Sequence, residues 1–343
     1  MSPAATSAPT QPTVLLRRQD VARLLRMPDC IEAVELAFLR HAQGRTIPPA
    51  VLGVHVEGGG FHVKAAGLID AIAGRPVFAA KVNANFPGNP DRTGLPTIQG
   101  MIALFDASDG RVLALLDSIE ITSLRTGAAT AVAARYLARP GPATVTIYGC
   151  GEQGRYQLRA LACVRPLARV MVIDVSADRA ARFATLMGEE LDVDVRVVPG
   201  PDAAARETSI WVTCTPARRW YLGRRHVAAG AFVAAVGADN PEKQEIEPEL
   251  LAASAVVADV LDQCLSIGDL HHAIAAGTMR REDVRAELAE VVSGSKKGRQ
   301  SAHEVIVFDS TGTALEDVAA AALVYERAVL EGAGIAVALG GAR

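Results

Sequence analysis

The stretch that decides the fold reads Ala143-Thr144-Val145-Thr146-Ile147-Tyr148-Gly149-Cys150-Gly151-Glu152-Gln153-Gly154. Its first half is a short, β-rich apolar run, which is typical of a buried strand. Its second half is a complete G-x-G-x-x-G turn, and residues 153–164 continue with a helix-like pattern. A second apolar run, over residues 169–173, ends on Asp174. This order of strand, glycine turn, helix, strand and acid predicts a βαβ unit that binds a dinucleotide.

Each glycine of the turn has a physical role in that prediction. Gly149 permits the tight turn at the end of the strand, and Gly151 lets the backbone approach a pyrophosphate. Gly154 lets the helix pack closely against the strand. The N-terminus of that helix offers unpaired N–H groups and a positive dipole end to the phosphates.

The acid at the end of the second strand predicts which dinucleotide is bound. Asp174 can accept hydrogen bonds from a ribose diol, and its charge would repel a 2′-phosphate. The sequence therefore favours NAD over NADP. Arg179 and Arg182 follow closely and weaken this preference, so NADP stays an alternative.

Composition sets the broad class. The 343 residues are enough for about two domains, and half of them are hydrophobic. The formal net charge is -3, and there is no basic block that would indicate a nucleic-acid partner. The apolar runs are shorter than the ~18 residues that a membrane span needs, and the N-terminus lacks a signal-peptide pattern. The five scattered cysteines are typical of reduced thiols, so a cytoplasmic protein is expected.

No metal site is expected from the sequence. The adjacent pair His271-His272 points to two faces of a predicted helix, and no cysteine pair or H-E-x-x-H motif accompanies it. Cys150 lies inside the glycine turn and is interpreted as a small filler residue, because no dedicated histidine partner is evident in the sequence.

Taken along the chain, the patterns change character near Pro140. Residues 1–13 are rich in Ala, Pro, Ser and Thr and are expected to be disordered. Helices are expected over 20–25, 31–41 and 121–138, with Thr122 or Ser123 as the N-cap of the third. Strands are expected over 51–56, 61–65, 77–82, 100–105 and 112–116, and a loop over 83–96. Beyond Pro140, strands over 143–148, 169–173, 193–198, 209–215, 231–236, 255–258 and 305–308 alternate with helix-like stretches, as in a doubly wound sheet, and 313–330 is a final helix.

Two cationic side chains stand at places where an anion could bind. Lys81 ends an apolar strand, although a lysine at a strand end can also simply be solvated. Arg125 lies near the start of the predicted third helix, where a guanidinium opposes the positive end of the helix dipole. That placement makes sense if a carboxylate or a phosphate is held there, and a surface salt bridge is the alternative.

Two further stretches follow apolar strands of the doubly wound part. Asp239 comes after residues 233–236, at the carboxyl end of a strand, where open α/β sheets bind ligands. Its alternative role is a turn or cap residue before Pro241. Ser310-Thr311-Gly312 follows another strand and could approach a nicotinamide or cap the last helix.

Together, these stretches resemble the ornithine cyclodeaminase/mu-crystallin family over about residues 45–330. The resemblance is carried by Ala80-Lys81-Val82-Asn83, Gly94-Leu95-Pro96-Thr97, Leu115-Leu116-Asp117, Thr122-Ser123-Leu124-Arg125-Thr126-Gly127-Ala128-Ala129, the glycine turn, Gly237-Ala238-Asp239 with Lys243-Gln244-Glu245, and Phe308-Asp309-Ser310-Thr311-Gly312. It implies a homodimer of two-domain subunits. The Rossmann NAD(P)-binding domain would span 140–312, and a mixed α+β substrate-binding and dimerisation domain would combine 14–139 with 313–343.

The resemblance also implies roles for single residues. Lys81 and Arg125 would bind and polarise the substrate carboxylate, and Asp239 would act as the acid/base near the substrate nitrogen. The implied cofactor contacts are Thr126, Gly149, Gly151, Glu152, Gln153, Gly154, Asp174, Thr215, Ser310 and Thr311.

One departure from the family pattern concerns the positively charged residues that bind the substrate carboxylate. Many members carry an arginine directly after a proline in the N-terminal segment, whereas Pro48-Pro49 is followed here by Ala50. Lys64 stands where the cyclodeaminases have an apolar residue, and we expect it to supply the missing positive charge. Ornithine is therefore less expected as the substrate than the family name suggests.

The function expected from the sequence is an NAD(P)-dependent oxidoreductase. Hydride would pass between the nicotinamide and the α-carbon of a small imino or amino acid, as in a pyrroline-2-carboxylate reductase or an alanine dehydrogenase. One alternative is an ornithine- or lysine-type cyclodeaminase that releases ammonia. The other is a non-catalytic, mu-crystallin-like protein that binds a nucleotide and a small ligand.

Overall fold

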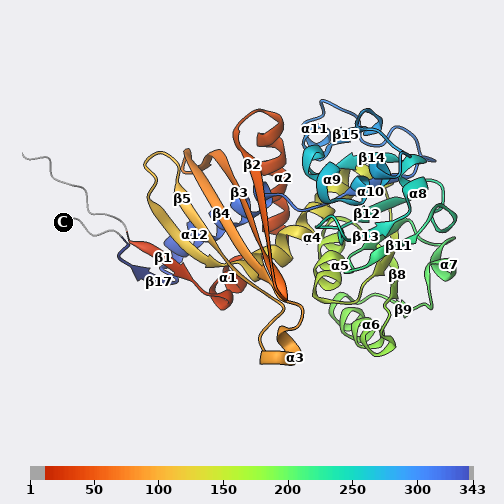
Figure 1. Cartoon of the computed structure of the whole chain (residues 1–343), viewed down its shortest axis with the longest axis horizontal. Helices are drawn as coiled ribbons and strands as arrows, with labels where there is room; N and C mark the ends of the chain where they lie inside the picture. Colours follow the sequence, from red (N-terminus) through yellow and green to blue (C-terminus); the bar gives the residue numbers. More distant parts are fainter. Residues whose placement is uncertain (1–11, 340–343) are drawn as a thin grey trace, which may run out of the picture. The chain divides into compact units, whose positions relative to one another are not determined.

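The computed structural model describes residues 12–339, which form two compact units (Figure 1). Within the described residues, unit 1 consists of residues 12–26, 45–122 and 317–339. Unit 2 consists of residues 27–44 and 123–316. These boundaries differ from the predicted domain boundaries, because residues 27–44, 123–139 and 313–316 group with unit 2. The predicted disorder of residues 1–13 falls mostly outside the described residues, and it is wrong for Thr13, which begins a strand.

Unit 1 is built on a seven-stranded sheet in the order β17-β1-β6-β5-β4-β3-β2. Its strands are β1 (Thr13–Leu16), β2 (Thr46–Val56), β3 (Gly59–Ile72), β4 (Arg75–Asn85), β5 (Ile98–Asp106), β6 (Val112–Asp117) and β17 (Ile335–Val337). Its helices are α1 (Arg18–Leu24), α3 (Asn89–Thr93) and most of α12 (Ala314–Glu331). Figure 1 shows α12 lying along one face of this sheet.

The two faces of this sheet differ in burial. Side chains on successive residues of a strand point to opposite faces. One set of alternating residues is buried in the core of unit 1, for example Leu68, Ile102 and Leu104. The opposite face is apolar but open: Leu52 and Met101 are 59% and 44% exposed. Cross-strand pairing joins them in one row that runs through Leu52, Val63, Val82 and Met101.

Unit 2 is built on an eight-stranded, wholly parallel sheet in the order β15-β14-β16-β12-β10-β7-β8-β9. Its strands are β7 (Ala143–Tyr148), β8 (Leu167–Ile173), β9 (Val195–Val197), β10 (Ile210–Thr213), β12 (Phe232–Ala235), β14 (Ala255–Ala258), β15 (Ala286–Glu287) and β16 (Ile306–Asp309). A short parallel pair, β11 (Arg218–Leu222) and β13 (Gln244–Ile246), stands beside it. The chain moves outward from β7 to β9 and then returns to β10 on the other side of β7. The strand order therefore reverses between β7 and β10, where doubly wound sheets bind their ligands.

Helices lie between successive strands of this sheet along the chain, as the sequence predicts for a doubly wound sheet. They are α5 (Glu152–Val164), α6 (Ala177–Leu191), α7 (Pro201–Ala204), α8 (Pro248–Ala252), α9 (Leu261–Ile267), α10 (Asp269–Ala275) and α11 (Leu288–Val292). The unit 2 helices α2 (Met27–Ala42) and α4 (Ser118–Leu137, from residue 123 on) precede the first strand of the sheet. The predicted fold class, a Rossmann part plus a mixed α+β part, is confirmed. No helix within residues 12–339 is both long and apolar enough to cross a membrane.

The start of α4 corrects one prediction. The helix begins at Ser118, where the Asp117 carboxylate accepts the Ile119 N–H at 3.0 Å. Thr122 and Ser123 are therefore inside the helix and do not cap it. Arg125 consequently lies well beyond the first turn, and because the field of a helix dipole falls off within that turn, the dipole argument for an anion at Arg125 fails. The loop predicted over 83–96 also contains the short helix α3.

Candidate active site

The glycine turn of unit 2 has the geometry that a pyrophosphate site requires. Gly149 has a φ of 111°, a region that favours glycine. A Cβ at Gly154 would overlap the carbonyl oxygen of Gly149, so only glycine lets α5 start this close to β7. Gly151 is the N-cap of α5, and a Cβ there would meet no atom within 4 Å. The backbone at Gly151 therefore borders open space at the N-terminus of α5, beside the switch point.

Asp174 is held in place beside this turn. Its two carboxylate oxygens accept the N–H groups of Cys150 at 2.9 Å and of Ser176 at 2.8 Å. The side chain is only 4% exposed, and the Arg179 guanidinium lies 3.6 Å from one of its oxygens. Burial, followed by the charge of Asp174, raises the pKa of the Cys150 thiol to about 12. Cys150 is thus a neutral thiol at pH 7, which is consistent with its interpretation as a filler residue.

Two of the predicted cofactor contacts carry buried polar atoms that need a partner. The side-chain oxygens of Gln153 and Ser310 are buried and make no hydrogen bond within residues 12–339. Buried polar atoms are normally satisfied, so an orphaned one indicates an absent ligand or water. Together with the glycine turn, these two atoms fit a dinucleotide.

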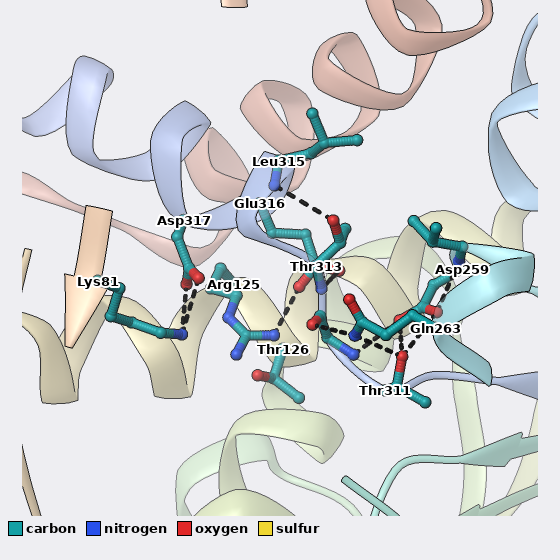
Figure 2. Close-up of polar contacts among 12 residues, drawn as sticks. Lys81, Arg125, Thr126, Asp259, Gln263, Thr311, Thr313, Leu315, Glu316 and Asp317 are labelled. Carbon is teal, nitrogen blue, oxygen red and sulfur yellow. Dashed lines mark hydrogen bonds and ion pairs between the residues drawn. The ribbon is translucent and has the colours of Figure 1, made fainter. Parts of the chain in front are cut away.

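The other predicted cofactor contacts are engaged with protein groups. The Thr311 hydroxyl donates to Asp259 at 3.0 Å and accepts from Gln263 at 2.7 Å. The Thr126 carbonyl accepts the Gln157 amide at 3.3 Å. Glu152, in the first turn of α5, accepts the Ser123 hydroxyl at 3.5 Å. Thr311 is therefore fixed by its neighbours (Figure 2).

Sequence reasoning gave no role to Glu245, which organises this end of the sheet. It is fully buried and accepts the Thr215 N–H at 2.6 Å, the Tyr221 hydroxyl at 2.6 Å and the Gly237 N–H at 2.7 Å. Burial raises the pKa of Glu245, while the hydrogen bonds from Tyr221 and Thr215 lower it. One carboxyl group thus ties the end of β10 to the turn that leads to Asp239.

Asp239 lies in an open turn that follows β12. Its side chain is 54% exposed and forms an ion pair with Lys243 at 2.7 Å. A neighbouring amide, that of Asn240, contacts the same oxygen at 3.4 Å. An acid in this position can exchange protons with solvent, which an acid/base residue must do between turnovers.

In unit 1, Lys81 belongs to a buried ion pair. Its ammonium lies 2.8 Å from both carboxylate oxygens of Asp317, and the side chains are 4% and 2% exposed (Figure 2). Lys64 on β3 stands directly opposite Lys81 on β4 and is also buried. Paired residues of antiparallel strands share a face, so two lysine side chains lie side by side there. Ala50 pairs with Ala65 and therefore lies on the other face, so Lys64 adds its charge beside Lys81 and not at position 50.

In unit 2, Arg125 forms a second buried ion pair. Its guanidinium donates to Glu316 at 2.7 Å, and Glu316 also accepts the Thr313 N–H at 3.2 Å (Figure 2). A Cβ at Gly312 would lie 2.5 Å from the Arg125 guanidinium, so this glycine makes room for Arg125. Lys81 is therefore not a solvated lysine at a strand end, and Arg125 does not form a surface salt bridge, because each side chain is buried and paired with an acid.

The two acids of these pairs are consecutive residues, Glu316 and Asp317, at the start of α12. Sequence reasoning missed them. The signal was present, since two adjacent acids stand in an otherwise alanine-rich apolar helix, and acids are almost never fully buried unless they are paired.

The described residues offer no metal centre. No group of three or more His, Cys, Asp or Glu side chains within residues 12–339 has the arrangement of a metal site. The rings of His271 and His272 contact the backbone carbonyls of Leu265 and Lys243 at 3.1 and 2.8 Å.

Comparison with known proteins defines the class. Residues 11–332 match the ornithine cyclodeaminase/mu-crystallin family. The chain belongs to this family, as the sequence patterns indicated. Among characterised relatives, it is 37% identical to the alanine dehydrogenase of Archaeoglobus fulgidus over 94% of this chain and 97% of that protein. It is 33% identical to the iminosuccinate reductase of Paracoccus denitrificans over 93% of this chain and 98% of that protein.

Solved structures agree with this assignment. An archaeal alanine dehydrogenase dimer with bound NAD superposes with a TM-score of 0.90 at 35% identity, over 96% of this chain and 99% of that one. The Δ1-pyrroline-2-carboxylate reductase of Thermococcus litoralis, in complex with NADH and L-proline, gives a TM-score of 0.90 at 33% identity, over 95% and 100% of the two chains.

Proposed function

We propose that this protein is an NAD-dependent oxidoreductase that reduces a small α-imino acid to an amino acid, or catalyses the reverse reaction. The observation that carries the proposal is the combination of a glycine turn and Asp174 in unit 2 with two buried cations, Lys81 and Arg125, that are held by consecutive acids. The relatives named above share this chemistry. NADH would supply the hydride that the C=N carbon of the imine accepts.

The residues of this chain have separate tasks in that reaction. Lys81 and Arg125 bind the substrate carboxylate, and Lys64 adds a third positive charge. Asp239 keeps the imine nitrogen protonated, directly or through a water, which makes the neighbouring carbon electrophilic. Gln153 and Ser310 offer their buried oxygens to the cofactor, and Asp174 accepts from its ribose.

A substrate panel tests the proposal. The protein is mixed with NADH and, in turn, Δ1-pyrroline-2-carboxylate, pyruvate plus ammonia, and ornithine, while nicotinamide absorbance and ammonia are followed. We expect NADH oxidation with at least one imine. Release of ammonia from ornithine without net NADH oxidation would instead identify a cyclodeaminase. Tight NADH binding without turnover of any substrate would favour the non-catalytic alternative.

Cofactor preference depends on Asp174. We expect NADH to bind more tightly than NADPH, because a buried carboxylate at the end of β8 repels a 2′-phosphate. Asp174→Ser should narrow or reverse the ratio of the two dissociation constants, since Arg179 then faces the phosphate without an opposing acid. Fluorescence titration measures both constants. A native preference for NADPH of about tenfold, or 1.4 kcal/mol, would contradict this assignment.

Lys64 should strengthen substrate binding. A charge-assisted contact is worth ~1.5–3 kcal/mol, so Lys64→Met should lower kcat/KM for carboxylate substrates by roughly ten- to a hundredfold. The exposed Lys297→Met is the matched control and should change kcat/KM little. Equal kcat/KM in the native protein and in Lys64→Met would mean that Lys81 and Arg125 bind the substrate carboxylate without help from Lys64.

We also propose that two copies of the chain associate through the open apolar face of the unit 1 sheet. Soluble proteins rarely expose large contiguous apolar patches, and the related archaeal alanine dehydrogenase is a dimer. The row of Leu52, Val63, Val82 and Met101 spans four neighbouring strands, which suits an isologous contact.

Val82→Lys should therefore convert the dimer to a monomer, because it would bury a charge at the contact. Light scattering coupled to gel filtration measures the mass. Leu186→Lys, at an exposed apolar position on α6, is the control and should leave the mass unchanged. A native protein that is monomeric at all concentrations would refute the proposal.

A further inference from the structure

Unit 2 has a cavity of about 510 Å³ at the edge of its sheet opposite to the glycine turn. The cavity lies at the amino ends of β7 and β10, where Ala143 and Ile210 begin these strands, whereas Gly149 and Cys214 follow their carboxyl ends. Nucleotides bind at the carboxyl ends of such strands, so this cavity does not belong to the candidate active site. We propose that it binds a small organic anion, namely a carboxylate or phosphate monoester with an apolar body.

The first cationic group of the cavity is Arg299. Its guanidinium donates to four carbonyl oxygens, those of Leu137 at 2.7 Å, Glu304 at 2.7 Å, Ser301 at 3.2 Å and Ala231 at 3.3 Å. These acceptors are neutral backbone groups. They fix the orientation of the guanidinium, and no acid among the described residues forms a direct ion pair with it. Arginine remains charged at neutral pH, so the cavity wall carries a fixed cation.

The second cationic group is Arg139, directly after α4. It is exposed and makes no hydrogen bond or ion pair with any residue between 12 and 339. Its stem packs on Gly230, because a Cβ at that glycine would lie 3.1 Å from its Cδ and Nε atoms. Since Arg299 binds the carbonyl of the next residue, Ala231, the two guanidinium groups flank the same short turn.

The nearby acid, Glu304, attracts Arg299 but forms no direct ion pair with it among the described residues. Glu304 gives one carboxylate oxygen to Arg285 at 2.7 Å, and the other accepts the backbone N–H groups of Gln300 and Ser301. Arg139 and Arg299 are therefore two like charges near each other, and neither forms a direct ion pair with an acid within residues 12–339. An anion between them would replace a repulsion with two attractions, and guanidinium groups suit carboxylate and phosphate oxygens geometrically.

The remaining walls indicate what else the ligand contains. Pro140, Pro142 and Ile210 line the cavity as apolar surfaces. The volume falls within the ~300–1,000 Å³ typical of small-molecule sites, which is more than an inorganic anion fills. A ligand with one anionic end and an apolar body of ring size would use both the cations and these walls.

Calorimetry with defined probes tests the proposal in the presence of saturating NADH. Phenyl phosphate and benzoate each combine an anion with an apolar ring, inorganic phosphate lacks the ring, and benzyl alcohol lacks the charge. We expect at least one aromatic anion to bind, more tightly than inorganic phosphate and much more tightly than benzyl alcohol. Arg139→Gln should weaken this binding by about tenfold or more, because it removes one charge-assisted contact.

Arg206→Gln is the matched control, because Arg206 is exposed, likewise has no ion pair within residues 12–339 and does not line the cavity. It should leave the dissociation constant unchanged. The proposal is overturned if neither aromatic anion binds, if benzyl alcohol binds equally well, or if both arginine variants weaken binding to the same extent. NADH affinity, measured in parallel, should be equal in all three proteins, which separates this site from the proposed catalytic function.

Discussion

Asp239→Asn is expected to lower turnover by roughly 10²–10⁴, the usual contribution of a positioned acid/base. The substitution preserves the shape of the side chain and its contact with Lys243, and it removes the group that can exchange a proton. Nucleotide binding should change little, because the glycine turn and Asp174 are untouched. Steady-state rates of imine reduction and a fluorescence titration with NADH measure the two effects.

A matched control separates acid/base chemistry from a general loss of surface charge. Asp262 is also an exposed aspartate in an ion pair, 2.6 Å from Arg281, and Asp262→Asn should keep native turnover. Lys243→Met should retain most of the activity of the native protein, since it removes the partner of Asp239 and keeps the acid. Native turnover in Asp239→Asn would show that Asp239 is a turn residue before Pro241.

The parts of the fold that could be predicted depend on local sequence. In unit 2, most strands are short apolar runs that are followed by a turn, so the sequence predicts the β7–α5–β8 segment and most later strands at nearly the right places, although not the two-residue strand β15. The pairs β1–β17 and β11–β13 were not found, because short strands are stabilised by partners far along the chain and leave little local pattern. The start of α4 is predicted too late because Thr122 and Ser123 are residue types that favour an N-cap, whereas the Asp117 carboxylate accepts the Ile119 N–H near the true start of the helix.

The sequence predicts the cationic residues of the candidate site, Lys81 and Arg125, but it does not predict the acids that pair with them. Lys81 and Asp317 are 236 positions apart in the sequence, and no local sequence pattern indicates that their side chains meet in the folded protein. The direct pairing of Lys64 with Lys81 depends on the register of a hairpin, which a one-residue slip would abolish. The sequence indicates no role for Glu245 beyond its place in a family motif, because its contacts with Thr215 and Gly237 join segments that only the folded chain brings together.

The second large effect is expected at the buried pair of Lys81 and Asp317. Removing one partner leaves an uncompensated charge in the core of unit 1, which costs ~3–5 kcal/mol in comparable buried pairs. Asp317→Leu and Lys81→Met should each lower the free energy of unfolding by this amount. Denaturant unfolding, followed by circular dichroism, measures it. If both variants lose less than about 1 kcal/mol of unfolding free energy, the buried pair stabilises the fold no more than a surface ion pair does.

The double variant Lys81→Met/Asp317→Leu separates stability from function. Replacing a buried ion pair by apolar side chains of similar volume is often neutral or stabilising, so the double variant should recover most of the stability that either single variant loses. It still lacks the ammonium that we assign to the substrate carboxylate, and kcat/KM should stay roughly ten- to a hundredfold or more below the native value. Recovery of both stability and kcat/KM would mean that the pair only supports the fold, and the carboxylate would then depend on Arg125. Recovery of stability alone would assign Lys81 to the substrate, because a residue with a purely structural role regains its function when the fold does.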